Sequence, residues 1–146
     1  MKIIKLKGQD KELYSLVGPL VMNSEVQTYN LNYPFKTGPG YIWFVAVDKE
    51  SVVAGFMPVK PEGNKRAKIN NYYVAGDNEE VFSALLEEIV CTLSTDYEIE
   101  SITQLRHIPV FEKAGFYTAL SWKKYVKMRM SEKKKEEEGA DEKECI

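Results

Sequence analysis

The sequence predicts a mixed α/β (α+β) domain in which helices flank a mostly antiparallel central sheet containing one parallel strand pair. Three strand patterns, at 41–48, 52–60 and 67–75, follow one another across short turns, which is typical of an antiparallel meander. An amphipathic helix pattern at 79–93 comes next, followed by a strand pattern at 98–105. Because a strand–helix–strand unit forms a crossover, we expect the strands at 67–75 and 98–105 to be parallel.

The N-terminal third predicts a strand, a helix and a long loop. A short strand is expected at 2–7, and Asp10 is placed to cap the helix that follows it. Gly18 and Pro19 are expected to break or kink that helix. Residues 23–40 have no hydrophobic period and predict a long loop, with or without one helical turn. In the meander, Gly55 indicates a bulge or a close approach of another backbone segment.

The C-terminal third predicts a short helix, a closing strand and a tail. Residues 107–116 form the helix pattern, which is expected to end at Gly115 in a left-handed conformation. Strand character resumes over 117–130. Residues 131–146 contain blocks of like charge and no apolar stripe, so we expect a disordered, charged tail there. The sequence therefore predicts one folded domain over 1–130 and a tail over 131–146.

The composition limits the kinds of partner. The 146 residues are 44% hydrophobic and carry a net charge of -2, which suits a single core. A charge this small gives no global field for nucleic acid or an anionic membrane and leaves only a local basic patch open. Two cysteines do not form a disulfide framework, and their spacing indicates no metal site. Neither a signal-peptide core nor a membrane span is evident, so we expect a cytoplasmic protein. The sequence is compatible with a homodimer and does not fix the oligomeric state.

The order of these elements, together with the string "FEKAGF" at 111–116, resembles the GNAT superfamily of N-acetyltransferases. The resemblance implies a GNAT-like domain over 1–130 that moves an acetyl group from acetyl-CoA to a primary amine on a small molecule or peptide. It also implies that acetyl-CoA lies where the two parallel strands separate, with its pyrophosphate at the N-terminus of the helix at 79–93. The cofactor-binding residues implied in this way are Val74, Ala75, Gly76, Asn78, Gln104 and Phe111.

Two departures from the family pattern favour an alternative. The loop "AGDNEE" has one glycine and no Arg or Gln, and Glu79 and Glu80 would repel a pyrophosphate. It could instead be a well-capped helix start, since either Asp77 or Asn78 can cap the helix. Asp77 and Glu80 also have the spacing of a capping box. Phe111 also lacks the hydroxyl that many family members use to protonate the CoA thiolate. The alternative is a catalytically degenerate GNAT-fold binding or regulatory protein that does not use acetyl-CoA.

Three residues are candidates for catalysis. His107, the only histidine, has an unperturbed pKa suited to a general base, although it can equally decorate the short helix. Tyr72 and Tyr73 lie on opposite faces of their strand, so one of them could act as an acid or position the substrate. Otherwise both are packing residues. Tyr33, Phe35 and Tyr41, in the loop before the meander, either form an aromatic wall for the acceptor or close the core.

Overall fold

A computed structural model describes residues 1–130, and the tail predicted at 131–146 lies outside the described residues. The strands and α-helices in chain order are β1 (Lys2–Lys7), α1 (Lys11–Val21), α2 (Ser24–Tyr29), β2 (Ile42–Val47), β3 (Val53–Pro61), β4 (Arg66–Ile69), β5 (Tyr73–Val74), α3 (Glu79–Leu93), β6 (Glu98–Gln104), α4 (Ile108–Lys113), β7 (Phe116–Ser121) and β8 (Tyr125–Met130).

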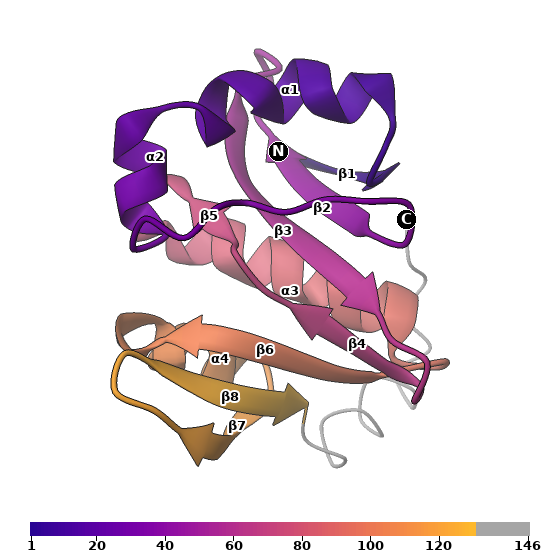
Figure 1. The fold of residues 1–146 in the computed structure, drawn as a ribbon, viewed down its shortest axis with the longest axis vertical. Helices are drawn as coiled ribbons and strands as arrows, with labels where there is room; N and C mark the ends of the chain where they lie inside the picture. The colour runs from indigo at the N-terminus through magenta and orange to yellow at the C-terminus, as the bar shows by residue number, and fades with distance from the viewer. Residues whose placement is uncertain (131–146) are drawn as a thin grey trace.

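The strands form one eight-stranded sheet in the order β1-β2-β3-β4-β6-β8-β7, with β5 paired to β3 (Figure 1). Every pairing is antiparallel except that of β4 with β6, which is parallel. The predicted fold class and the predicted parallel pair are therefore confirmed.

Helices cover both faces of the sheet. On one face α3 packs an apolar stripe that includes Phe82, Leu86 and Ile89 into the larger core cluster. On the other face α1 packs Leu13 and Val17 into a smaller cluster with strand residues. Figure 1 shows α3 behind the sheet and α1 in front of it. No helix within 1–130 is long and apolar enough to cross a membrane.

Helix α1 differs from its prediction, because it runs through Gly18 and Pro19 to Val21. Proline removes its own N–H bond, here to the carbonyl of Ser15 four residues earlier, and its ring crowds that carbonyl. Both Pro19 and Ser15 are exposed, so water can solvate that carbonyl. Asp10 is the residue before the helix as predicted, but its carboxylate accepts a hydrogen bond from the N–H of Lys7, at 2.8 Å, and caps no helical N–H.

The third strand of the meander is interrupted, although the sequence predicts one strand over 67–75. Ile69 pairs with Val59 and Tyr73 pairs with Phe56, so three residues on one strand face two on the other. This extra residue is a β-bulge, in which Asn71 has a φ of 56°. The close approach predicted at Gly55 is confirmed, since a Cβ there would lie 2.8 Å from the carbonyl oxygen of Tyr73.

The closing segment is a hairpin of two strands, β7 and β8, where the sequence predicts a single strand. A turn at 122–124 reverses the chain, and the N–H of Trp122 donates to the carbonyl of Tyr125 at 2.8 Å. The return strand β8 then lies between β6 and β7. Gly115, which ends the short helix, has the predicted left-handed conformation with a φ of 100°.

Candidate functional site

The parallel strands β4 and β6 stay paired for only part of their length. Their pairing runs from Arg66 with Glu98 to Ile69 with Ser101, and beyond the bulge β5 pairs only with β3. Figure 1 shows β5 and β6 diverging toward the side that carries α2. Main-chain groups of successive strand residues face alternate edges. One of Tyr73 and Val74 therefore directs its N–H and C=O across the gap toward β6.

A continuous chain of hydrogen bonds crosses this gap. The N–H of Gln104 lies 3.0 Å from the Tyr72 hydroxyl, which lies 2.6 Å from Nδ1 of His107. On the far side of the ring, Nε2 of His107 lies 2.8 Å from Oδ1 of Asp77, whose Oδ2 accepts from Nε of Arg106 at 2.9 Å. Since Tyr72 accepts from Gln104, its O–H donates to Nδ1, and the Nε2–H of neutral His107 donates to Asp77.

Burial decides the charge states along this chain. Tyr72, Gln104 and His107 are almost fully buried residues, at 2%, 3% and 2% exposure. Burial raises the pKa of Tyr72 and lowers the pKa of His107, and for His107 it outweighs the opposing effect of the Asp77 carboxylate. Burial alone would raise the pKa of Asp77, but hydrogen bonds from Arg106 and His107 outweigh it and lower that pKa. The stable form is a neutral imidazole beside an ionised carboxylate.

The N-terminus of α3 carries more charge pairing than the sequence suggests. Of the two residues predicted as possible caps, Asn78 caps the helix, because its side-chain oxygen accepts from the N–H of Val81 at 3.1 Å. The alternative capping box of Asp77 and Glu80 is therefore wrong. Glu79 pairs with Nζ of Lys113 at 3.5 Å. Ahead of the helix, Gly76 has a φ of 63° and no atom within 4 Å of the position of a Cβ. Space is therefore open at Gly76, just ahead of Asp77 and Glu79, whose carboxylates already hold cations.

The structure brings most of the predicted site residues to the gap. The Gln104 side chain donates from Nε2 to the carbonyl of Tyr29 at 2.9 Å, and its Oε1 accepts from Arg106. Fully buried Phe111 packs on Tyr72, with ring centroids 5.6 Å apart. Val74 is fully buried at the end of β5, while Ala75 is exposed beside it.

Tyr73 alone among the catalytic candidates faces the other side of the sheet, which agrees with the expected alternation. Its ring contacts Tyr29 and Phe56, with centroids 5.0 and 5.7 Å away. The sequence did not identify Asp77, Arg106 or Tyr29 as members of the site. One signal was available, because three polar residues stand at 104–107, directly after a predicted parallel strand.

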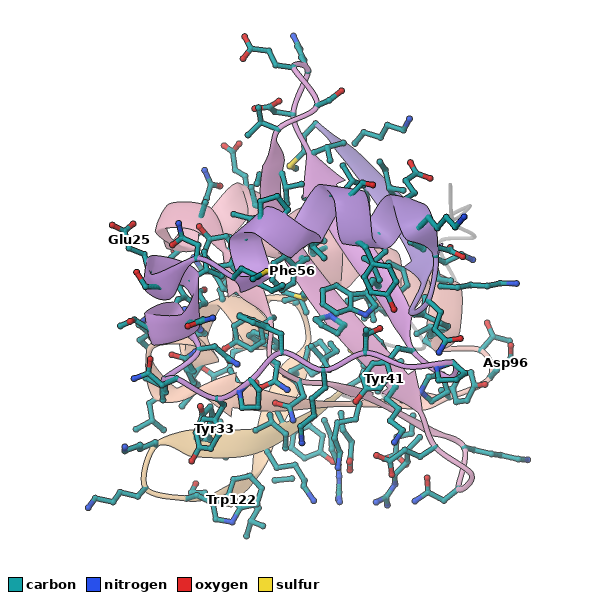
Figure 2. All side chains as sticks on the ribbon, turned by 45° about the horizontal axis from the view of Figure 1, so that its top comes forward. Glu25, Tyr33, Tyr41, Phe56, Asp96 and Trp122 are labelled. Atoms are coloured by element: carbon teal, nitrogen blue, oxygen red, sulfur yellow. The ribbon has the colours of Figure 1, made fainter. Side chains whose placement is uncertain are left out.

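A pocket of about 230 Å³ opens where the strands part, on the face of the sheet opposite α3. Its lining consists of Tyr33, Pro34, Lys36, Asn70, Asn71, Ile102 and Tyr125. Figure 2 shows Tyr33 beside β8, where its ring lies 6.2 Å from that of Tyr125. Of the three aromatic residues expected to form a wall, Tyr33 lines this pocket. Phe35 packs on core residue Phe56, and Tyr41 lies under Nζ of Lys60.

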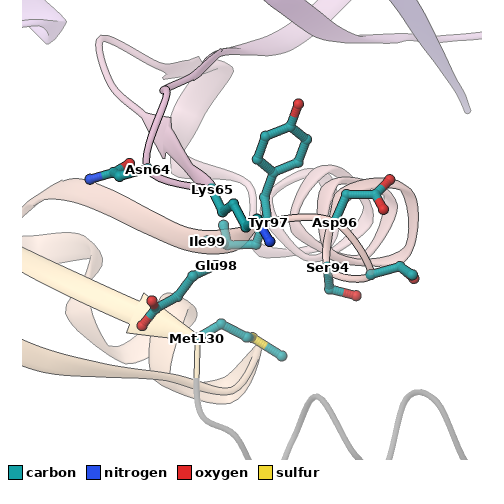
Figure 3. A pocket seen from close by; sticks show the side chains of 9 residues that line it. Asn64, Lys65, Ser94, Asp96, Tyr97, Glu98, Ile99 and Met130 are labelled. Atoms are coloured by element: carbon teal, nitrogen blue, oxygen red, sulfur yellow. The ribbon is translucent and has the colours of Figure 1, made fainter.

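A second hollow of about 300 Å³ lies at the other end of the parallel strands (Figure 3). It is formed where the β3–β4 turn, at Asn64 and Lys65, meets the α3–β6 loop, at Ser94 to Glu98. The strands are fully paired at that end, since Arg66 pairs with Glu98. This hollow therefore has no contact with the main-chain groups exposed by the strand separation.

The depressed pKa of His107 predicts that acid destabilises the fold. The unfolded chain takes up this proton near pH 6.5, whereas the folded chain resists it. The contribution of neutral His107 to the free energy of unfolding is thus fully present above about pH 6.5. It is lost as the pH falls through the folded pKa, and the free energy of unfolding then drops by at most about 1.4 kcal/mol per pH unit. Urea unfolding between about pH 7.5 and pH 5 measures this slope. His107 is the only histidine, so a slope that persists in His107→Gln would contradict this assignment.

No family model matches this sequence, and no curated protein sequence is significantly similar to it. Solved structures are similar. An acyl-CoA N-acyltransferase from Pseudomonas aeruginosa is 14% identical, covers 90% of this chain and 100% of its own, and has a TM-score of 0.67. Spermidine N-acetyltransferase from Vibrio cholerae, solved with CoA and spermine, is 11% identical over 91% of this chain and 97% of its own, with a TM-score of 0.65.

An aminoglycoside 6'-N-acetyltransferase from Enterococcus faecium is 16% identical over 89% of this chain and 96% of its own, with a TM-score of 0.64. Identities this low establish the architecture alone. The common architecture includes the mostly antiparallel sheet and its single parallel strand pair. This chain has the fold of the GNAT N-acetyltransferases.

Proposed function

We propose that this protein is an N-acyltransferase that moves an acetyl group from acetyl-CoA to a primary amine on a small molecule or peptide. The observation that supports it is the separation of β5 from β6 directly ahead of the N-terminus of α3. Separated strands leave main-chain donors and acceptors at Tyr73 or Val74 to pair with the amides of a pantetheine chain. An N–H at this edge can also polarise the thioester carbonyl.

Acetyl-CoA fits the start of α3 if two cations exchange partners. The open space at Gly76 allows a phosphate to approach the main chain, and the helix dipole favours an anion there. Arg106 supplies the guanidinium that the loop sequence lacks, and Lys113 supplies an ammonium. Both now hold carboxylates, Asp77 and Glu79. These pairs are more than a third exposed, so exchanging them for a pyrophosphate costs little.

Residues of this chain can then be assigned to separate roles in the acetyl transfer. In the transfer, the amine nitrogen forms the new C–N bond, the C–S bond breaks, and the thiolate takes up a proton while the amine loses one. Nδ1 of His107 is hydrogen-bonded to Tyr72 and Nε2 to Asp77, so neither ring nitrogen is left to act on the substrate. We therefore assign His107 and Tyr72 to positioning Gln104 at the end of β6. With Tyr72 assigned in this way, Tyr73 is the member of the predicted pair that is left to act as an acid or to position the substrate.

A second candidate is a GNAT-fold binding or regulatory protein that does not use acetyl-CoA. The hydrogen-bonded chain favours it, because the Tyr72 hydroxyl occupies the N–H of Gln104 within the gap. The exposed carboxylates of Glu79 and Glu80 at the start of α3 also disfavour a pyrophosphate.

Thermal unfolding with and without acetyl-CoA distinguishes the two candidates. At about one hundred times its dissociation constant, a bound ligand stabilises the fold by roughly 2.7 kcal/mol. We expect a stabilisation of this size, which corresponds to a shift of roughly 10 °C in Tm for a domain of this length. Calorimetric titration with acetyl-CoA provides the dissociation constant that fixes the concentration.

Two variants test the pyrophosphate position in the same assay. Arg106→Met is expected to reduce the shift, and Glu79→Gln is expected to increase it by releasing Lys113. Lys124→Met, in the β7–β8 turn, serves as the control and is expected to leave the shift unchanged. If millimolar acetyl-CoA raised the Tm of none of these proteins, the transferase proposal would fail and the second candidate would remain.

A further inference from the structure

The pocket at the strand break is held together by a buried asparagine. Asn30, with 3% exposure, donates from Nδ2 to the carbonyl of Tyr33 at 2.9 Å and to Oδ1 of Asn71 at 3.0 Å. The first bond lies within the loop after α2, and the second joins that loop to the bulge between β4 and β5. Two of the pocket walls are therefore fixed to each other in the fold.

The same bonds orient the amides that line the pocket. Oδ1 of Asn71 is occupied by Asn30, and Oδ1 of Asn70 accepts from the N–H of Asn71 at 2.9 Å. An amide whose oxygen is occupied has its NH2 group left to offer a ligand. Asn70 and Asn71 thus present hydrogen-bond donors to the pocket.

The other polar side chains of the lining are also donors. Lys36 is the one charged residue in the lining, and it is a cation. Burial raises the pKa of Tyr125, and the neighbouring Tyr33 adds to that effect, so Tyr125 keeps its hydroxyl proton. Lys127 pairs with the lining residue Ile102 across β6 and β8, which places a second cation on the same face. The lining contains no carboxylate.

We propose that this pocket binds the carboxylate group of a small amine acceptor, which is therefore an amino acid or a similar aminocarboxylate. Two amide NH2 groups, two phenols and an ammonium match the acceptor oxygens of a carboxylate. A volume of about 230 Å³ suits a ligand of this size. The acceptor role rests on the proposed function, whereas the binding of the carboxylate does not.

This ligand class differs from the polyamine named with one similar structure, the Vibrio cholerae spermidine N-acetyltransferase bound to spermine. A polycation would bring positive charge against Lys36 and would find no acidic partner in the lining. We therefore expect the pocket to disfavour polyamines.

The test compares ligand pairs that differ by one carboxylate, in the absence of acetyl-CoA. L-lysine is compared with 1,5-diaminopentane, and γ-aminobutyrate with propylamine, by calorimetric titration at constant ionic strength. We expect each aminocarboxylate to bind at least about tenfold more tightly than its partner, consistent with a charge-assisted site. A third pair, phosphoethanolamine and ethanolamine, tests whether the pocket prefers a phosphate group. Tighter binding of phosphoethanolamine than of either aminocarboxylate would overturn the assignment to a carboxylate.

Two variants locate the binding in this pocket. Asn71→Asp keeps the oxygen that Asn30 uses but replaces the NH2 donor with an anion, so the preference should reverse toward 1,5-diaminopentane. Lys36→Met should weaken the binding of L-lysine by a factor of about five or more. Lys49→Met, in the β2–β3 turn, should leave that binding unchanged. Equal binding of both ligand types, no binding of either aminocarboxylate, or unchanged preferences in both variants would overturn the proposal. Because acetyl-CoA is absent, a failed transferase assay leaves these outcomes unaffected.

Discussion

Replacing His107 with alanine is expected to lower the free energy of unfolding by roughly 2–4 kcal/mol. The ring is buried at 2% exposure and packs against Phe82, with centroids 4.8 Å apart, so its removal leaves a cavity. It also removes the acceptor of the Tyr72 hydroxyl, which stays buried. Asp77 keeps Arg106 as a partner, so the cost is concentrated on the Tyr72 side.

Equilibrium urea unfolding near neutral pH measures this loss. Met22→Ala is the control, since the Met22 side chain is 80% exposed and its removal should change stability by no more than about 0.5 kcal/mol. A loss below about 1 kcal/mol for His107→Ala would contradict a structural role for the buried chain. A normal stability combined with lost activity would instead return His107 to the role of general base.

The order of the early elements and the parallel strand pair were predictable because their signals are local and strong. The stripe of α3 has apolar residues at helical spacing, including Phe82, Leu86 and Ile89, and the observed helix begins and ends within one residue of its prediction. A crossover helix between two strands then leaves a parallel pairing as the main option.

The breaks inside strands were not predictable, because a β-bulge depends on the neighbouring strand. The residues 67–75 alternate well enough to be one strand, and only the register with Val59 and Phe56 shows that one residue is extra. The closing hairpin was missed for a similar reason, since its turn at 122–124 contains neither Gly nor Pro.

The candidate site was predictable as separate residues but not as a chain. His107, Tyr72 and Gln104 were each identified, yet their hydrogen bonds join segments 32 to 35 residues apart in sequence. Asp77 and Asn78 were both predicted as possible helix caps, and the structure gives that role to Asn78. Only the fold places Arg106 and His107 beside Asp77, where ion pairing outweighs capping.

Replacing Tyr72 with phenylalanine is expected to lower the free energy of unfolding by roughly 1–3 kcal/mol, although only the volume of one hydroxyl group is lost. The ring keeps its contacts with Phe82 and Phe111, so the cost comes from the Gln104 N–H and His107 Nδ1 left buried without a partner. Combined with His107→Ala in a double-mutant cycle, we expect a coupling energy of about 1 kcal/mol. Additive losses would show that the two residues stabilise the fold independently. If kcat fell while stability was unchanged, the Tyr72 hydroxyl would be a proton donor to the substrate and its positioning role would be wrong.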